Sequence, residues 1–537
     1  MSHLFLTARL ILLAGALALA GLASAKGDEI AGLVAGHVDA ALEVRNEGRP
    51  VDAALMLSDL LDALLDADEA LDPAILSDVL FHYAKTLRLA DRPDAAETMA
   101  RRALQIDTGR LPADSPALAA VYSVLGAALL DQGRGAEAEI ELRAALPIYE
   151  AAFGDHAYTA VTLYQLAQAA DAQAHYPAAA RLAARALVIL TRVPEADQPD
   201  GLSGQARFLA ARSYGEWYDS ARRASDWGGT RDAMLGRAAL AGAGQDRAAR
   251  RVELSEFLLA RSLESQAAFE AGRFPEIEVL AAVAMEIWQA EQDLDPVYMS
   301  AAMAALAHAL SEQARPDEAL AMQGRRFEFV TTAMQDRPVS VAYALSSYVT
   351  ALTNNGQDAE ARAVFARHAA ALQGRLGGTD RAVLAMTEAR LLSLDGDHAS
   401  ALRLAGEAQA DLEAGGATAH DLQNFHSERS AIARRAGQYE DAYADLLRGR
   451  ELADPAPGSF DAMYWDGSLA VIALYHLHRP GTALDRVRDA SASLIGHASA
   501  QADARGIADE GREVTSLRNL FILRTEAVWG AAHAREP

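Results

Sequence analysis

Residues 122–145 read YSVLGAALLDQGRGAEAEIELRAA, and this stretch decides the fold. Apolar and small residues recur at helical spacing on both sides of a glycine-centred turn at Gly133. The spaced residues are, in order, Tyr122, Leu125, Gly126, Leu129, Ala138, Leu142 and Ala145. The stretch predicts two short helices joined by a tight turn, with small side chains where the helices touch.

The small residue after the turn recurs about every 42 residues along the chain. Its positions are Ala53, Ala96, Ala138, Ala179, Ile277, Ala319, Ala361, Ala401, Ala442 and Ala483. The long gap before Ile277 covers two periods, and Ala233 fits the missing unit. A second small position lies twelve residues earlier in most units, and a third lies seven residues later. This regularity predicts about eleven stacked helical hairpins.

The pattern of residues 122–145 resembles the tetratricopeptide repeat family. The longer period resembles the kinesin-light-chain-type variant, in which a linker such as 151–156 joins longer helices. Two departures are clear. The Trp and the closing Pro are absent from most units, and Glu264, Glu388 and Arg429 stand where Leu is usual. The resemblance covers roughly residues 30–495 and implies an all-α, right-handed superhelical solenoid of antiparallel helix pairs. The alternative is a generic alanine-rich helical bundle, which would not require so steady a period.

The N-terminus is typical of a secretory signal peptide. Met1–Arg9 is short and carries one positive charge, Leu10–Leu22 is apolar, and Ala23 to Ala25 form a small-x-small cleavage site. The alternative is an uncleaved membrane anchor. The chain has no cysteine, which excludes a lipid anchor and disulfides. Arginine and alanine bias points to a bacterial genome, so we expect a periplasmic or secreted protein cleaved after Ala25.

These features give the expected domain organisation. It consists of a signal peptide at 1–25, about four repeats at 26–199, a degenerate arginine-rich repeat with a long loop at 200–250, about six repeats at 251–495, and a capping helix at 496–537. The cap is expected because the last repeat of a solenoid has an otherwise uncovered face.

Charge excludes one class of partner. The chain has 74 acidic and 49 basic residues and a net charge of −25, so we expect no nucleic-acid partner. The region 207–251 runs against this balance because nine arginines gather there. Arg222 and Arg223, in a segment that looks like a long inter-helix loop, form either an anion patch or pairs with acidic residues of neighbouring units. The second alternative is favoured, because acidic helices flank the region.

The sequence offers no catalytic, metal-binding or cofactor-binding constellation. Phosphate-binding glycine loops, Gly-x-Ser-x-Gly elbows and His-Glu-x-x-His helices are all absent from it. The close pair His476 and His478 would point to different faces of a helix. The acidic cluster 62–72 lacks the spacing of a calcium loop. We therefore expect no cofactor and no enzymatic activity.

The resemblance implies a non-enzymatic scaffold that binds an extended peptide or a partner protein on its concave face. In tetratricopeptide proteins the first helix of each unit lines that face. The corresponding positions of this sequence hold mainly polar side chains. They are Lys85, Arg88, Tyr164, Gln168, Gln266, His308, Tyr343, Ser346, Thr350, Arg390, Asn424, Ser427 and Arg434. This composition suits a peptide with acidic groups or a free carboxylate. The alternative is an enzyme or ligand sensor in the same groove, with His308, Glu312 and Arg390 as candidates.

Overall fold

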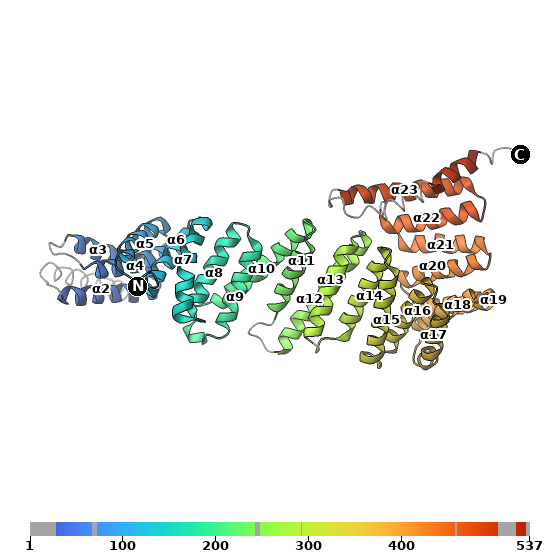
Figure 1. Ribbon diagram of the computed structural model, residues 1–537, viewed down its shortest axis with the longest axis horizontal. Coiled ribbons are helices and arrows are strands. Elements are labelled where there is room, and N and C mark those ends of the chain that lie inside the picture. Colours follow the sequence, from blue (N-terminus) through green and yellow to red (C-terminus); the bar gives the residue numbers. More distant parts are fainter. Residues whose placement is uncertain are drawn as a thin grey trace, which may run out of the picture. The chain divides into compact units, whose positions relative to one another are not determined.

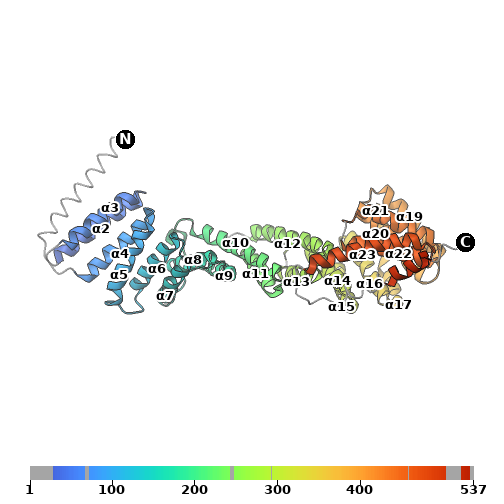
Figure 2. The same cartoon turned by 90° about the horizontal axis from the view of Figure 1, so that it is seen from above.

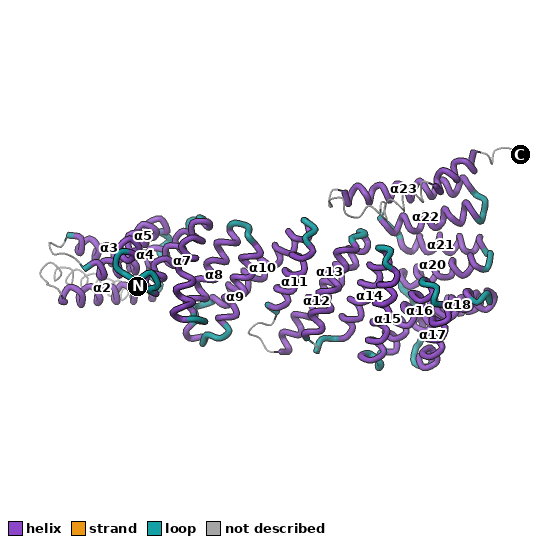
Figure 3. The backbone as a smooth tube through the Cα atoms, in the orientation of Figure 1, coloured by secondary structure: helices purple, strands orange, loops and turns teal. Residues whose placement is uncertain are grey.

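The computed structural model describes residues 28–66, 72–241, 247–291, 293–456, 459–502 and 522–532. Within these ranges the regular elements are helices, and no strand occurs (Figure 3). The predicted all-α repeat fold is thereby confirmed. The signal segment 1–25 lies outside the described residues.

The chain forms two compact units, 1–219 with 239–246 and 220–238 with 247–537. The helices of the first are α2 (Asp28–Asn46), α3 (Pro50–Leu65), α4 (Pro73–Leu89), α5 (Pro93–Thr108), α6 (Pro116–Asp131), α7 (Gly135–Phe153), α8 (Ala157–Ala172) and α9 (Tyr176–Leu190), followed by the 3-10 turn η1 (Glu195–Asp197) and α10 (Leu202–Arg223). Helix α10 crosses the unit boundary. From α2 to α9 each helix packs against the next, as Figures 1 and 2 show.

The second unit repeats the same plan. Its helices are α11 (Trp227–Ala239), α12 (Arg247–Glu270), α13 (Phe274–Ala290), α14 (Pro296–Glu312), α15 (Pro316–Ala333), α16 (Pro338–Asn354), α17 (Asp358–Gln373), α18 (Gly378–Leu394), α19 (His398–Ala414), α20 (Ala419–Arg435), α21 (Tyr439–Ala453), α22 (Phe460–Tyr475) and α23 (Pro480–Ala502). Each helix from α12 to α23 packs against its successor. First helices of neighbouring hairpins also touch, as α12 touches α14 and α18 touches α20.

Tight turns inside the hairpins follow the sequence pattern. Gly133 ends the α6–α7 turn with a φ of 74°, in the left-handed region that glycine adopts without strain. Ala314 takes the same conformation in the α14–α15 turn, with a φ of 57°. Left-handed backbone costs a residue with a Cβ atom about 1–2 kcal/mol. The repeat geometry therefore outweighs local preference at Ala314.

The predicted small positions are packing positions. Ala138 on α7 is completely buried, as is Ala145, which lies about two turns later. A Cβ atom added to Gly126 on α6 would lie 2.5 Å from Leu142 Cγ on α7. The missing side chain at Gly126 is what lets α6 and α7 approach so closely.

The α14–α15 hairpin has a polar seam at the corresponding positions. Gln323 stands where α7 has Leu142, and its Oε1 atom is buried with no hydrogen-bond partner among the described residues. Arg326 stands where α7 has Ala145, and its Nε donates to Ser300 Oγ on α14 at 3.2 Å. Burial lowers the pKa of Arg326. No carboxylate pairs with Arg326 in the described part of the chain.

Ion pairs join successive hairpins at corresponding positions of two repeats. We call these ion pairs rungs. Arg134, just before α7, contacts Glu97 on α5 at 2.7 Å. Arg315, just before α15, contacts Glu278 on α13 at 3.0 Å. In both rungs the arginine precedes the second helix of its hairpin, and the glutamate lies near the start of the second helix one repeat earlier.

The arginine-rich segment departs from the expected long loop. Arg222 and Arg223 form the last turn of α10, and only residues 224–226 separate that helix from α11. The physical reason is a capped turn. Asp226 Oδ1 accepts a hydrogen bond from the Gly229 backbone N–H at 2.9 Å. A Cβ atom at Gly229 would lie 2.3 Å from the Asp226 carboxylate, so glycine is what admits the cap.

A helix at 522–532 covers the last hairpin. Its Leu523 packs against Ala470 and Val487, and its Ala527 is completely buried. The residues that pack are therefore Leu523 and Ala527, whereas the neighbouring Arg524 and Val528 are exposed. Of the expected cap at 496–537, residues 503–521 and 533–537 lie outside the described part.

Candidate functional site

The second unit contains a cavity of about 490 Å³ between α12, α13 and α14, with α20 facing it. Its floor is apolar. Ile277, Leu280 and Ala281 of α13 are almost completely buried there. The α14 side is built from small residues, because Ala301, Ala302, Ala304 and Ala305 all line the cavity. Between Tyr298 and His308, this run of methyl groups leaves space that longer side chains would fill.

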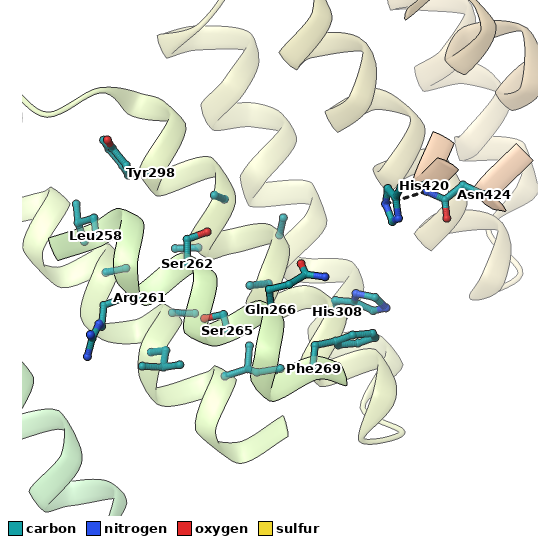
Figure 4. A pocket seen from close by; sticks show the side chains of 18 residues that line it. Leu258, Arg261, Ser262, Ser265, Gln266, Phe269, Tyr298, His308, His420 and Asn424 are labelled. Atoms are coloured by element: carbon teal, nitrogen blue, oxygen red, sulfur yellow. Dashed lines mark hydrogen bonds between the residues drawn. The ribbon is translucent and has the colours of Figure 1, made fainter. Parts of the chain in front are cut away.

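Polar side chains stand at the rim of this cavity (Figure 4). Gln266 of α12 and His308 of α14 lie on one side, and His420 and Asn424 of α20 lie across from them. The His308 ring lies against Phe269, with 4.2 Å between centroids and 32° between the ring planes. An amide–imidazole hydrogen bond of 3.1 Å joins Asn424 Nδ2 and His420 Nε2. An apolar floor beneath a few convergent polar groups is the usual composition of a binding site.

Desolvation and nearby carboxylates act on His308 at the rim and on Tyr343 of α16, which does not line the cavity. His308 is exposed in the groove, yet the surrounding helices desolvate its imidazolium and lower its pKa. The charges of Glu312 and Asp461 oppose that shift. Burial raises the pKa of Tyr343 on α16, and the nearby carboxylates of Asp421 and Asp380 add to that shift. Desolvation thus favours the neutral form of the His308 imidazole at neutral pH.

One charged residue lines the cavity itself, and it is neutralised. Arg261 of α12 contacts Glu264 at 2.8 Å, one turn along the same helix. A shallower depression of about 200 Å³ lies toward the N-terminal end of α12. It shares Tyr298 with the cavity. Leu259 borders that depression, and it is 54% exposed although apolar. The face of α12 that borders both hollows thus offers unburied apolar surface.

The structure brings three of the predicted groove residues to the cavity, Gln266, His308 and Asn424. Others are engaged along neighbouring first helices. Thr387 donates to Ser346 Oγ at 2.9 Å. A hydroxyl contact of 3.3 Å joins Ser427 to Tyr464. Their role in binding stays a prediction.

The remaining predicted residues of the second unit differ in exposure. Tyr343 and Arg434 are exposed, and Thr350 is half-buried. Arg390 is held in an ion pair with Glu428. Its charge is therefore already compensated within the protein.

In the first unit the four predicted residues lie on α4 and α8. Arg88 contacts Asp131 at 2.6 Å, and Gln168 donates to the Tyr164 hydroxyl at 3.3 Å. Lys85 is exposed, and burial together with the nearby cations Arg45 and Arg88 lowers its pKa. Two of the four cations in the predicted groove, Arg88 and Arg390, thus have carboxylate partners, which weakens the case for an acidic peptide.

Sequence reasoning missed several residues of the cavity, among them Ser262, Phe269 and Tyr298. Ser262 and Phe269 lie on the same side of α12 as Gln266, at minus four and plus three, so the helical period could have found them. Nothing in the sequence indicated that His420, more than one hundred residues away from His308, would face the same cavity.

The arrangement does not assemble the catalytic candidates. Glu312 lies one turn from His308, whereas Arg390 is paired with Glu428 and does not line the cavity. His476 stacks on Tyr439 with 4.2 Å between centroids. Among the described residues no group of three side chains is placed to hold a metal ion. The helices of the described ranges include none with the length and apolar character of a membrane span.

The arginines of 207–251 mostly face acidic side chains. Arg222 Nε lies 2.9 Å from Glu276 Oε1, and Glu276 is only 1% exposed. Further pairs are Arg212 with Asp171, Arg231 with Glu286, Arg237 with Glu253, Arg247 with Asp293, and Arg250 with Glu291. Arg223 is exposed and has no partner in the part of the chain that the structure describes. This pattern supports the structural interpretation of Arg222.

Comparisons with known proteins agree with the repeat pattern. The model of the family described as tetratricopeptide repeat matches residues 117–192. A search of curated proteins finds no match. Among solved structures, BtubC (BKLC) from P. vanneervenii is 19% identical, with a TM-score of 0.31 over 40% of this chain and 82% of its own.

Two further structures are similar at the same level. A putative kinesin light chain with nearly identical TPR-like repeats from Podosopora anserina is 16% identical, with a TM-score of 0.31 over 38% of this chain and 94% of its own. The Cut9–Hcn1 hetero-tetramer of APC/C is 10% identical, with a TM-score of 0.31 over 84% of this chain and 92% of its own. With the family match at residues 117–192, the resemblance of this chain to the tetratricopeptide repeat family is confirmed.

Proposed function

We propose that this protein is an exported, non-enzymatic scaffold that holds an extended segment of a partner protein against the first helices of its second unit. The observation that carries the proposal is the cavity of about 490 Å³ with an apolar floor and a polar rim. Its rim residues Gln266, His308 and Asn424 are exposed, so the site opens onto the surface rather than enclosing a ligand. An open site with an apolar floor suits one side chain of a longer partner.

Amide groups at the rim favour a peptide. Gln266 and Asn424 each carry a carbonyl acceptor and an amide donor, the two groups that complement a peptide backbone. Exposed apolar side chains next to the cavity, Leu259 and Leu263 of α12, supply additional contact surface. Interfaces of this composition place most of their binding energy in a few central apolar contacts.

Binding is tested by filling the cavity. Ala301 is exposed and lines the cavity, so Ala301→Trp is expected to occupy it without disturbing the core. Ala321→Trp places the same side chain on an exposed position of α15 and serves as the matched control. Immobilised wild type and both variants are incubated with periplasmic extract, and captured proteins are quantified by mass spectrometry. Partners lost with Ala301→Trp alone support the proposal, whereas identical capture by all three proteins contradicts it.

A small-ligand sensor is the second candidate, and the cavity volume favours it. Sites for drug-sized ligands occupy about 300–1,000 Å³, and the present cavity falls within that range. A thermal-shift screen of a metabolite library on wild type and Ala301→Trp separates the two candidates. A compound that stabilises wild type but not Ala301→Trp would identify a sensor.

Export is tested on the mature N-terminus. We expect the signal peptidase to cut after Ala25, because Ala23 and Ala25 follow a short apolar run. N-terminal sequencing of the exported protein should then begin at Lys26. A mature chain that still contains Leu10 would replace export with membrane anchoring.

A further inference from the structure

A buried polar side chain lines the cavity without a hydrogen-bond partner. Ser265 of α12 is only 9% exposed, and its hydroxyl has no partner among the residues that the structure describes. Leu258 and Ala268, on the same side of α12, are buried and apolar. A polar group removed from water loses free energy unless it is paired. A ligand that fills this cavity therefore has to supply a partner for Ser265.

A serine at the same repeat position of another hairpin has such a partner. Ser430 of α20 lies twelve residues before Ala442, and its Oγ donates to the Ala442 backbone carbonyl of α21 at 2.8 Å. The corresponding carbonyl for Ser265 belongs to Ile277 of α13, also twelve residues later. No hydrogen bond joins these two described residues. Ser265 and Ile277 both line the cavity, so space that a ligand can enter adjoins the hydroxyl.

The walls around Ser265 favour a flat apolar group. The α14 residues that line the cavity between Tyr298 and His308 are alanines, and their methyl groups form a wall without protruding side chains. Phe269 lines the cavity beside His308 (Figure 4). An aromatic ring buries a large apolar area against walls of this kind. The cavity thus suits an aromatic ring whose polar group lies at the end that reaches Ser265.

We propose that the cavity takes a tyrosine side chain of the extended partner segment and that its phenol hydroxyl forms a hydrogen bond with Ser265. The inference rests on the proposed function and names the residue that anchors the partner. The tyrosine hydroxyl lies at the tip of an apolar ring and both donates and accepts hydrogen bonds, as the Ser265 hydroxyl does. Phenylalanine and leucine would leave Ser265 unpaired. Tryptophan carries its N–H group at the side of the ring and only donates.

The first test is a selection from random peptides. A library of twelve-residue peptides displayed on phage is selected against the wild-type protein, with counter-selection against Ala301→Trp. The enriched sequences are expected to share one tyrosine. Enrichment of sequences that share Phe, Leu or Trp instead, and that still lose binding to Ala301→Trp, would overturn the inference and leave the proposed function standing. Failure to enrich any peptide that distinguishes the two proteins would overturn both.

The second test measures the hydrogen bond itself. The best enriched peptide and its form with Phe in place of Tyr, both labelled with fluorescein, are titrated by fluorescence polarisation into wild type, Ser265→Ala and the control Ser311→Ala. Ser311 is exposed on α14 and does not line the cavity. Wild type and control are expected to bind the Tyr peptide about 3–10-fold more tightly than the Phe peptide, the contribution of one hydrogen bond. Ser265→Ala should lose this preference, because the phenol then has no partner.

The Ser265→Ala variant is expected to fold. Alanine occupies the corresponding position in α4 and α8, where Ala84 and Ala167 are completely buried, and circular dichroism verifies the helix content of each variant. A preference for the Tyr peptide that is equally large in Ser265→Ala and in wild type would overturn the inference. Equal affinity of wild type for the two peptides would overturn it as well.

Discussion

The α6–α7 and α14–α15 hairpins share one period but are held together differently. In α6–α7 the seam is apolar, with Leu142 and Ala145 completely buried. In α14–α15 the same two positions hold Gln323 and Arg326, and the Gln323 carbonyl oxygen is buried without a hydrogen-bond partner. Helix positions are thus maintained even where two positions of the seam are polar, beside an apolar cluster that includes Met303, Leu310 and Met322. The period sets the backbone arrangement, and the seam residues set how strongly each hairpin resists opening.

The largest expected effect comes from removing the apolar seam. Leu142→Ala should destabilise the α6–α7 hairpin by about 2–5 kcal/mol, because it leaves a cavity among Leu125, Leu129 and Leu166. Gln323→Ala at the corresponding place in α15 should cost far less, since no hydrogen bond of Gln323 is lost. Native-state hydrogen exchange of the two hairpins measures both effects. Equal losses of protection would show that the two seams contribute alike.

Overpacking the apolar seam should have the next largest effect. Ala138→Phe inserts a ring where Ala138 is completely buried, and we expect a cost of about 1–3 kcal/mol. Urea denaturation followed by circular dichroism gives the change in unfolding free energy. A change near zero would mean that Ala138 is not a packing position and that the period has another cause.

Repairing the polar seam should stabilise the weaker hairpin. Gln323→Leu together with Arg326→Met replaces an unpaired amide and a buried guanidinium by apolar groups of similar length. We expect the unfolding free energy of α14–α15 to rise by about 1–2 kcal/mol, because buried polar groups without full partners are destabilising. Hydrogen exchange at α14 and α15 reports the gain. Lower protection in the double variant would instead assign the polar seam a stabilising role.

A buried carboxylate with two arginine neighbours is the counterpart to Arg326. Glu276 is almost completely buried and is contacted by Arg222 at 2.9 Å and by Arg273 at 2.7 Å. Arg222→Ala should lower stability by about 1 kcal/mol, because Glu276 keeps one of its two partners. Arg223→Ala, the adjacent exposed residue, is the matched control and should have no measurable effect. Denaturant titrations in which both variants lose the same stability would contradict the pairing.

The smallest expected effect is a difference in pH dependence. Desolvation by the surrounding helices lowers the pKa of His308 below the unfolded value of about 6.5, so the unfolded chain takes up a proton first as pH falls. Stability from neutral His308 is therefore present at pH 7 and declines below about pH 6.5. Arginine contacts lower the pKa of Glu137 and Glu139 on α7, so their contribution is lost only below about pH 4.5.

Between pH 7 and pH 5, hydrogen exchange should therefore show α14–α15 losing protection while α6–α7 keeps it, after correction for the intrinsic exchange rate. His308→Gln serves as the control and should reduce the loss in α14–α15. An unchanged pH profile in that variant would remove His308 as the cause.

The fold could be predicted from the sequence because each repeat restates the same packing rule. Ala138 and Gly126 each mark a contact between two helices. A small side chain that recurs about every 42 residues therefore predicts helix pairs that pack in the same way in each repeat. The candidate site could be predicted only in part. Gln266 and His308 follow from the period, but the facing His420 depends on how successive hairpins turn toward one another.

Ion-pair partners were beyond prediction for a similar reason. Arg222 and Glu276 are separated by more than one repeat, and several acidic residues compete for each arginine in the sequence. The expectation of a long inter-helix loop at 222–229 was wrong, because only residues 224–226 lie outside the two helices. In the structure Gly228 and Gly229 lie in the first turn of α11, and the carboxylate of Asp226 occupies the space that a side chain at Gly229 would need.

The rungs have a consequence for how such a gene changes length. The two rungs are Arg134–Glu97 and Arg315–Glu278. In each of them the glutamate lies 37 residues before the arginine. A duplication or deletion of one whole repeat can move an arginine and its glutamate together. Otherwise, the arginine meets the residue that holds the same position as the glutamate in the adjoining repeat. Unequal recombination by full periods therefore preserves the register of the array, whereas a shift of a few residues breaks a rung and a helix seam at once.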